Sequence, residues 1–185
     1  ITTLGGLTIE EPEIISAIEN ITNPQCAGES TGNINLIVSG GSTPYAYQWV
    51  SNGITIGTNN AINDLDSGSY IYTIIDSSNC QLSNTVEITP PSSLDLIASS
   101  IQSTCGNNNG SATVNASGGT PALSGYVYNW SNAVTGVSIA GSVDTQSNLS
   151  SGIFKVVVSD DFGCTDSTNI TISDSDGPLI DAESS

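Results

Sequence analysis

Gly40-Gly41-Ser42-Thr43-Pro44-Tyr45-Ala46-Tyr47-Gln48-Trp49 is the stretch that decides the fold, because the chain returns to it. The second occurrence begins at Gly118-Gly119-Thr120-Pro121 and reaches its tryptophan at Trp130. Counterparts are separated by 78 residues for the glycine pairs and by 81 for the tryptophans. A separation that changes only where loops differ in length indicates two copies of one domain.

The repeat also sets the predicted domain boundaries. We expect repeat 1 over 12–91 and repeat 2 over 92–178, because each ends on a Thr-rich strand followed by proline. Residues 1–11 resemble the last strand of a preceding copy, and residues 179–185 resemble the start of a following one. The sequence therefore predicts a window of a longer array, and the absence of a signal peptide says nothing about secretion.

Short runs rich in Ile, Val, Thr and Tyr, separated by Gly, Asn, Ser and Pro, predict β-strands throughout. We expect them at 14–19, 33–39, 45–50, 54–57, 60–65, 69–76 and 82–89, and again at 94–101, 111–117, 126–131, 136–140, 144–149, 153–160 and 167–173. This spacing favours an all-β fold of tandem immunoglobulin-like antiparallel β-sandwiches. Alternation along the strands places four aromatic residues in the structural core: Trp49, Tyr70, Trp130 and Phe154.

Composition excludes several functions. The chain has 18 acidic residues and one basic residue, and its net charge of −17 repels nucleic acid and anionic lipid, so we expect neither nucleic acid binding nor membrane insertion. It contains no histidine and no arginine, which excludes Ser/His/Asp and Cys/His catalysis within the segment. Composition does not exclude a hydrolase that uses a pair of carboxylates. Asp76 and Asp160, however, occupy matching strand ends, which favours a structural role, and we expect no enzyme.

The four cysteines occur two per repeat, at matching positions 79 residues apart for the first pair and 84 for the second. Their spacing is not typical of a zinc site, and disulfides in an oxidising compartment are favoured. We expect Cys26 to pair with Cys80, and Cys105 with Cys164. The two members of each pair would lie at opposite ends of a simple seven-stranded sandwich, so a staggered bond between neighbouring repeats stays open as the alternative.

Taken in order, these motifs resemble the SprB repeat of gliding Bacteroidota. The resemblance rests on Cys-x-Gly at 26–28, Gly-Gly-Ser-Thr-Pro-Tyr-Ala-Tyr-Gln-Trp at 40–49, Leu-x-x-Gly-x-Tyr at 65–70 and the closing Cys80. The second copy keeps Gly163-Cys164 but inserts residues after Pro121. The resemblance implies an extracellular, cell-surface protein that is very large, exported by type IX secretion and used in gliding, attachment or contact with other cells.

Three functional hypotheses follow. The leading one is a non-catalytic structural module of an adhesin or filament, whose partners are neighbouring repeats, identical chains in a homo-oligomeric filament, surface glycans or other cells. The alternative is a spacer or carbohydrate-binding module of a secreted hydrolase, with Tyr45, Tyr47 and Tyr126 as sugar contacts. The third is a calcium-stiffened stalk. No cofactor is expected otherwise, and the candidate calcium ligands are Asp64 and Asp66, Asp160 and Asp161, or Glu10, Glu11 and Glu13.

The loops differ most between the two copies, notably at 121–126 and 131–148. If the segment contacts a partner specifically, these loops are the first candidates, because the shared residues occupy scaffold positions.

Overall fold

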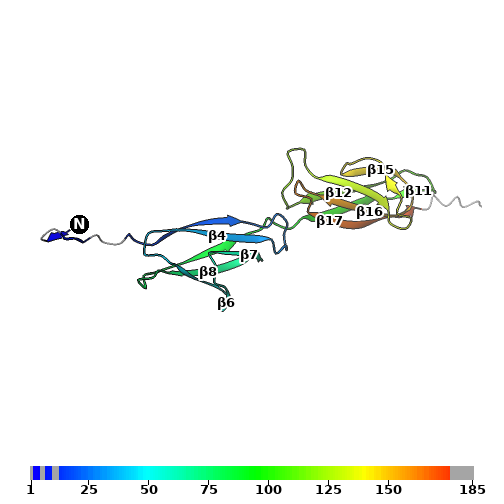
Figure 1. Cartoon of the computed structure of the whole chain (residues 1–185). Coiled ribbons are helices and arrows are strands. Elements are labelled where there is room, and N and C mark those ends of the chain that lie inside the picture. Colours follow the sequence, from blue (N-terminus) through cyan, green and yellow to red (C-terminus); the bar gives the residue numbers. More distant parts are fainter. Residues whose placement is uncertain (1, 5–6, 10–12, 176–185) are drawn as a thin grey trace, which may run out of the picture. The chain divides into compact units, whose positions relative to one another are not determined.

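The computed structural model describes residues 2–4, 7–9 and 13–175, which form two units, 1–90 and 91–185 (Figure 1). The predicted boundary, between residues 91 and 92, lies one residue from this division. Near the start of the chain, β1 (Thr2–Leu4) pairs antiparallel with β2 (Leu7–Ile9). The predicted start of a further repeat at 179–185 lies outside the described residues.

Unit 1 is a sandwich of a three-stranded and a four-stranded antiparallel sheet. The first sheet has the order β3-β4-β7, and the second has the order β6-β5-β8-β9. The strands are β3 (Ser16–Thr22), β4 (Gly32–Ser39), β5 (Ala46–Ser51), β6 (Ile54–Gly57), β7 (Ala61–Leu65), β8 (Gly68–Ile75) and β9 (Gln81–Ile88). The bounds of all seven strands lie within three residues of the bounds predicted from the sequence.

Unit 2 repeats this arrangement with sheets of order β10-β12-β15 and β14-β13-β16-β17. A short parallel pair, β11 with β18, is added and was not foreseen. The strands are β10 (Asp95–Ile101), β11 (Ser103–Thr104), β12 (Gly110–Ser117), β13 (Val127–Asn132), β14 (Ser138–Ile139), β15 (Thr145–Leu149), β16 (Gly152–Ser159), β17 (Thr165–Ile172) and β18 (Asp174–Ser175). The described residues contain no helix, and the predicted immunoglobulin-like all-β fold is confirmed.

Burial follows the strand alternation in the same way in both units. The pattern of buried and exposed positions along β4 is identical to that along β12, and β5 matches β13. Each unit has its own core, and the four predicted aromatic residues are all buried: Trp49, Tyr70, Trp130 and Phe154. Alternating side chains of two facing sheets therefore provide the hydrophobic stabilisation of each repeat separately.

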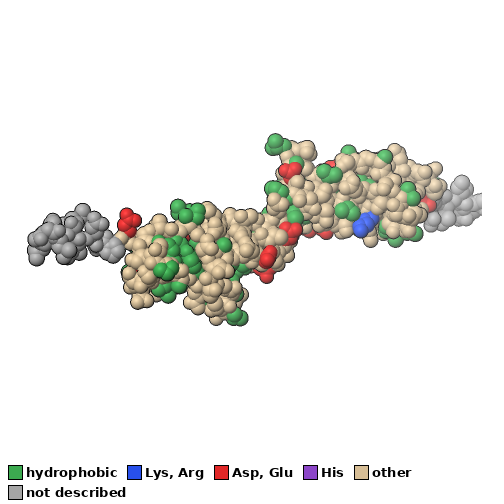
Figure 2. All heavy atoms as spheres, in the orientation of Figure 1, with side chains coloured by type: hydrophobic (Ala, Val, Ile, Leu, Met, Phe, Trp, Pro, Cys, Tyr) green, Lys and Arg blue, Asp and Glu red, His purple; other side chains and the backbone are tan. Residues whose placement is uncertain are grey.

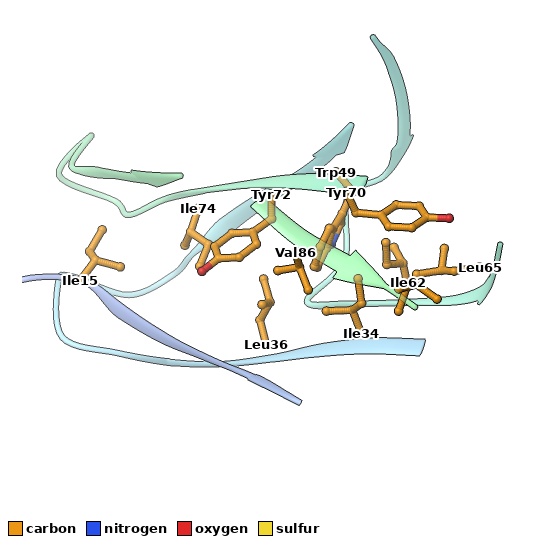
Figure 3. Packing of buried hydrophobic residues seen from close by; sticks show 11 residues of the cluster. Ile15, Ile34, Leu36, Trp49, Ile62, Leu65, Tyr70, Tyr72, Ile74 and Val86 are labelled. Carbon is orange, nitrogen blue, oxygen red and sulfur yellow. The ribbon is translucent and has the colours of Figure 1, made fainter. Parts of the chain in front are cut away.

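In unit 1 the core side chains of the two sheets point toward each other across the sandwich, with Trp49 and Tyr72 on one side and Ile34 and Leu36 on the other (Figure 3). The ring centroids of Trp49 and Tyr72 are 5.5 Å apart at an interplanar angle of 59°. Such tilted pairs add a little to the free energy gained by burial.

Tyr72 also carries a polar connection between the sheets, which sequence reasoning missed. Its hydroxyl donates to Glu19 Oε1 on β3 at 2.7 Å, and Asn84 on β9 donates to the same oxygen at 3.0 Å. Burial first, and then the bond to the Glu19 carboxylate, raises the pKa of Tyr72 to about 12. The Tyr72 bond in turn lowers the pKa of Glu19. Unit 2 has Val156 in place of Tyr72, so it lacks this connection.

Replacing Tyr72 with Phe is predicted to lower the free energy of unfolding of unit 1 by about 1–2 kcal/mol, because a partly buried bond to a charged group is lost. The wild-type bond needs a protonated phenol. Since the folded pKa of about 12 lies above the unfolded value of about 10, this stabilisation is present below pH 10 and is lost as the pH rises toward 12.

Denaturant unfolding between pH 8 and pH 12 measures the effect. The wild type should lose more stability than Tyr72→Phe over the upper part of this range. Parallel curves for the two proteins would contradict the assignment. Tyr126→Phe in unit 2 is the control, because the Tyr126 hydroxyl donates to the carbonyl of Gly118 and not to a carboxylate.

Candidate functional site at the two ends of each repeat

Each sandwich has a leading end, where its first strand begins, and a trailing end, where its last strand ends. In unit 1 the leading end is built on the turn after β4. Gly40 has φ of +72°, and a Cβ there would lie 2.1 Å from the carbonyl oxygen of Ile14. Gly41 donates its N–H to the carbonyl of Glu13 at 2.7 Å. Glycine is therefore required because the incoming chain runs directly against this turn.

A buried carboxylate holds this turn to the β8–β9 hairpin. Asp76 Oδ2 accepts the N–H of Ser42 at 2.9 Å, and Oδ1 accepts the N–H groups of Ser78 at 2.9 Å and Cys80 at 2.7 Å. These bonds, the one from Ser42 foremost, lower the pKa of the Asp76 carboxyl. The carboxylate is therefore satisfied by backbone donors of the turn and the hairpin, which is a structural role.

Unit 2 repeats the geometry with different neighbours. Gly119 donates to the carbonyl of Ser92 at 2.9 Å. Asp160 accepts the N–H of Thr120 at 2.9 Å, of Phe162 at 3.1 Å and of Cys164 at 2.9 Å. Asp76 and Asp160 are 4% and 6% exposed. The two aspartates that sequence reasoning weighed as catalytic carboxylates are thus the same backbone clamp in two copies, which we call the leading-end clamp.

The cysteines of one repeat lie at opposite ends of its sandwich. Cys80 closes the β8–β9 hairpin and belongs to the leading-end clamp, whereas Cys26 follows β3, whose last residue pairs with the beginning of β4. The neighbouring Asn23 accepts the N–H of Thr89, just after the last strand, at 3.0 Å, which places this loop at the trailing end. In unit 2 Cys105 lies at the trailing end, because its N–H donates to the carbonyl of Ser175 at 3.2 Å.

The predicted within-repeat disulfides, Cys26 with Cys80 and Cys105 with Cys164, are therefore wrong. Cys80 and Cys105 are exposed free thiols, and the disulfide-bonded cysteines are Cys26 and Cys164. The eight residues of β8 span about 26 Å, far more than the roughly 7 Å that a disulfide allows between Cα atoms. Topology alone thus forbids the within-repeat bond.

The aromatic motifs are scaffold as well. The indole N–H of Trp49 donates to the carbonyl of Asn59, and that of Trp130 to the carbonyl of Val143, both at 2.8 Å. The Tyr70 hydroxyl donates to the carbonyl of Asp66 at 2.9 Å, which is the bond expected of a tyrosine corner. Phe154 occupies the corresponding place in unit 2 without that bond.

The tyrosines considered as sugar contacts are partly buried against the cores. Tyr45 donates to the carbonyl of Gly40 at 2.5 Å, and Tyr126 to that of Gly118 at 2.7 Å. Tyr47 packs against the unit 1 core, and burial raises its pKa. None of the three stands free as a stacking platform, so the structure favours a packing role for them.

The calcium candidates do not converge. Among the residues that the structure describes, no three His, Cys, Asp or Glu side chains lie close enough to hold one metal ion. Asp66 accepts a bond from the Ser30 hydroxyl, and Asp160 is used in the clamp. Glu13 is described, whereas Glu10 and Glu11 lie outside the described residues.

A shallow groove recurs beside the edge strand of each four-stranded sheet. In unit 1 it measures about 600 Å³ and is lined by residues that include Asn59, Asp64, Asp66 and Tyr70. In unit 2 it measures about 470 Å³ and is lined by residues that include Asn132, Ser147 and Phe154. Of the two grooves, only that of unit 1 is lined by carboxylates, and that of unit 2 has the more apolar lining.

The loops that differ between the copies present apolar side chains. The loop at 121–126 exposes Leu123 fully, and within 131–148 Val134 and Val137 are 80% and 65% exposed. By contrast, most of the face drawn in Figure 2 consists of backbone and uncharged polar side chains. Within the described part of the chain, no helix has the length and apolar character needed to cross a membrane.

Residues 18–53 and 98–135 match the family model described as SprB repeat. Each of the two sandwiches therefore contains a stretch that matches the SprB repeat. The matched stretches begin in the first strand of each sandwich and end beyond β5 in unit 1 and β13 in unit 2, so they include the Gly-Gly turn and the tryptophan of both copies. None of the curated proteins compared with the chain is significantly similar.

Solved structures similar to this chain include the three N-terminal domains of the bacteriophage RB49 outer capsid protein Hoc. The TM-score is 0.53 at 15% identity, over 88% of this chain and 59% of that one. Immunoglobulin domains 1–5 of Sidekick-1 give 0.42 at 15% identity, over 90% and 40%. The mouse nectin-like molecule 4 ectodomain gives 0.44 at 10% identity, over 91% and 67%. The likeness to Hoc supports the fold alone.

Asp160→Ala is predicted to lower the free energy of unfolding of unit 2 by about 3 kcal/mol, because three backbone donors lose a charged acceptor. Thermal or urea unfolding measures this. Asp161→Ala is the matched control, since Asp161 is an exposed neighbour, and it should be nearly neutral. Equal effects of the two substitutions would show that the clamp does not stabilise the unit.

Acid should weaken the clamp of unit 1. Because the folded pKa of Asp76 lies below its unfolded value of about 3.9, its stabilisation is present above that pH and is lost as the pH falls through the folded pKa. Asp76→Asn should therefore be less stable at neutral pH and show a flatter decline between pH 5 and pH 2. An unchanged acid dependence would refute this account.

Gly118→Ala is predicted to prevent normal folding of unit 2 or to cost several kcal/mol, since the new Cβ would lie 2.0 Å from the carbonyl oxygen of Ser93. Gly163→Ala is the control: φ there is also positive, at +81°, but the space around it is open. It should cost only about 1 kcal/mol of backbone strain. Comparing the two melting temperatures separates the steric contact from the strain.

Proposed function

We propose that this chain is a non-catalytic structural segment of a very large extracellular adhesin or surface filament, which mediates attachment, gliding or contact between cells. The observation that carries the proposal is the double SprB match on two sandwiches with the same scaffold. SprB repeats are found in cell-surface proteins, and the disulfide-bonded cysteines suit an extracellular location. Export by type IX secretion belongs to the same proposal.

The chemistry of the side chains supports a mechanical rather than a catalytic role. The carboxylates at the leading ends are saturated by backbone donors, and the tryptophans are buried in the cores. Units that share the same core and the same leading-end clamp can build a long array that extends from the cell surface. The loops of such an array can differ from one unit to the next without changing this scaffold.

The net charge of −17 suits this role. It keeps densely displayed chains apart and soluble, and it disfavours contact with anionic surfaces except through short uncharged patches. The apolar loop residues Leu123, Val134 and Val137 are the exposed points where unit 2 differs most from unit 1.

Immunolabelling of intact native cells with an antibody raised against this chain tests the proposal. The expected result is label along long surface filaments, and Fab fragments of the antibody should reduce attachment or gliding. Negative-stain images of the purified native protein should show a long array. Label confined to a compact secreted enzyme would overturn the proposal.

The alternative is a carbohydrate-binding or spacer module of a secreted hydrolase. The observation that favours it is the polar groove of unit 1, which is lined by Asp64 and Tyr70 among other residues. A glycan array probed with this chain, with Asp64→Asn and with Asp161→Asn as control separates the two. Glycan binding abolished by Asp64→Asn alone would favour the alternative.

A further inference from the structure

The cysteines lie at opposite ends of each sandwich, the arrangement that the sequence analysis noted as the difficulty for a within-repeat bond. Cys80 and Cys164 are counterparts in the leading-end clamp, where each donates its N–H to the buried aspartate, at 2.7 and 2.9 Å. Cys26 and Cys105 are counterparts at the trailing end. Each repeat thus carries one cysteine at each end of its sandwich.

Each free thiol has a disulfide-bonded counterpart in the other copy. Cys80 is free and exposed, whereas its counterpart Cys164 is disulfide-bonded. Cys105 is free and exposed, whereas its counterpart Cys26 is disulfide-bonded. The same position in the same fold is therefore able to form a disulfide, and what differs is whether a partner is at hand.

We propose that the two free thiols, Cys80 at a leading end and Cys105 at a trailing end, are sites for disulfides that join copies of this domain end to end. On this rule Cys105 is a covalent attachment site for the leading end of a following repeat, and Cys80 is one for the trailing end of a preceding repeat. The partner in each case is another copy of this domain. The inference concerns the chemistry of the repeat ends and holds whether the array serves adhesion or spacing.

The redox step balances with an external disulfide. The thiols of Cys105 and of the partner's leading-end cysteine lose two protons and two electrons as the S–S bond forms. The electrons reduce the disulfide of a thiol–disulfide oxidoreductase or of oxidised glutathione to two thiols. Exposure of both Cys80 and Cys105 leaves them open to this exchange.

The physical consequence is a chain of covalent joints. Each such bond would attach to the leading-end clamp, because the cysteine there lies within the hairpin held by Asp76 or Asp160. Force along an array would then pass through the disulfides at the joints as well as through the linkers.

Two measurements on the full chain test the inference. The first is non-reducing peptide mapping after alkylation of free thiols. Cys80 and Cys105 should be alkylated, whereas Cys26 and Cys164 should be protected. A peptide joining Cys26 to Cys80, or Cys105 to Cys164, would overturn the rule.

The second measurement uses Cys80→Ser, which keeps the trailing-end thiol, and Cys105→Ser, which keeps the leading-end thiol. In a glutathione redox buffer, a mixture of the two should form disulfide-linked dimers joined through Cys105 and Cys80, in excess of what random pairing gives. Each variant alone should remain largely monomeric, as should the double variant Cys80→Ser/Cys105→Ser. Random pairing, or no dimer in the mixture, would overturn the assignment.

The two experiments also separate this inference from the proposed function. Loss of the end-to-end pairing would leave the surface labelling unaffected, whereas label on a secreted enzyme would leave the disulfide rule intact.

Discussion

The rest of each repeat depends on one buried carboxylate at its leading end. Asp76 in unit 1 and Asp160 in unit 2 each accept three backbone N–H groups, one from the glycine turn and two from the hairpin that ends in a cysteine. A charged acceptor with three donors is among the stronger polar interactions a small domain contains. It brings together the incoming chain, the first sheet and the second sheet at a single point.

The leading-end clamp explains which residues recur in the two copies of the glycine turn and its hairpin. The glycine pair is needed because the incoming backbone passes too close for a side chain, as the contacts of Gly40 with Ile14 and of Gly118 with Ser93 show. The residue after the pair must offer its N–H to the aspartate, a requirement that Ser42 and Thr120 both meet. The cysteine follows in the same hairpin, at the leading end of the repeat, and donates its N–H to the aspartate.

The two copies have similar hydrophobic cores but differ in the polar contacts and short strands that supplement them. Unit 1 joins its sheets through the Tyr72 hydroxyl and the Glu19 carboxylate, whereas unit 2 packs Val156 at that position. Unit 2 instead adds the short β11–β18 pair at its trailing end. Such exchanges are possible because the alternating apolar positions contribute most of the stabilisation, and polar links add increments to it.

The sequence by itself determined the repeat, the strand positions within a few residues, the sandwich fold and the buried aromatic residues Trp49, Tyr70, Trp130 and Phe154. These follow from local periodicity and from turn residues, which act over short distances along the chain. It also indicated that Asp76 and Asp160 are structural, because both recur at matching strand ends. The donors from the glycine turns, Ser42 and Thr120, could not be predicted, since they lie more than 30 residues away from the carboxylates in the sequence.

Only the tertiary structure decided the state of the cysteines. Spacing along the chain favoured Cys26 with Cys80, but two residues in one domain can be paired only if the fold brings their Cα atoms close. An antiparallel sandwich of eight-residue strands keeps them at opposite ends. Which ends of the strands meet is a property of the sheet topology, and a list of cysteine positions does not contain it.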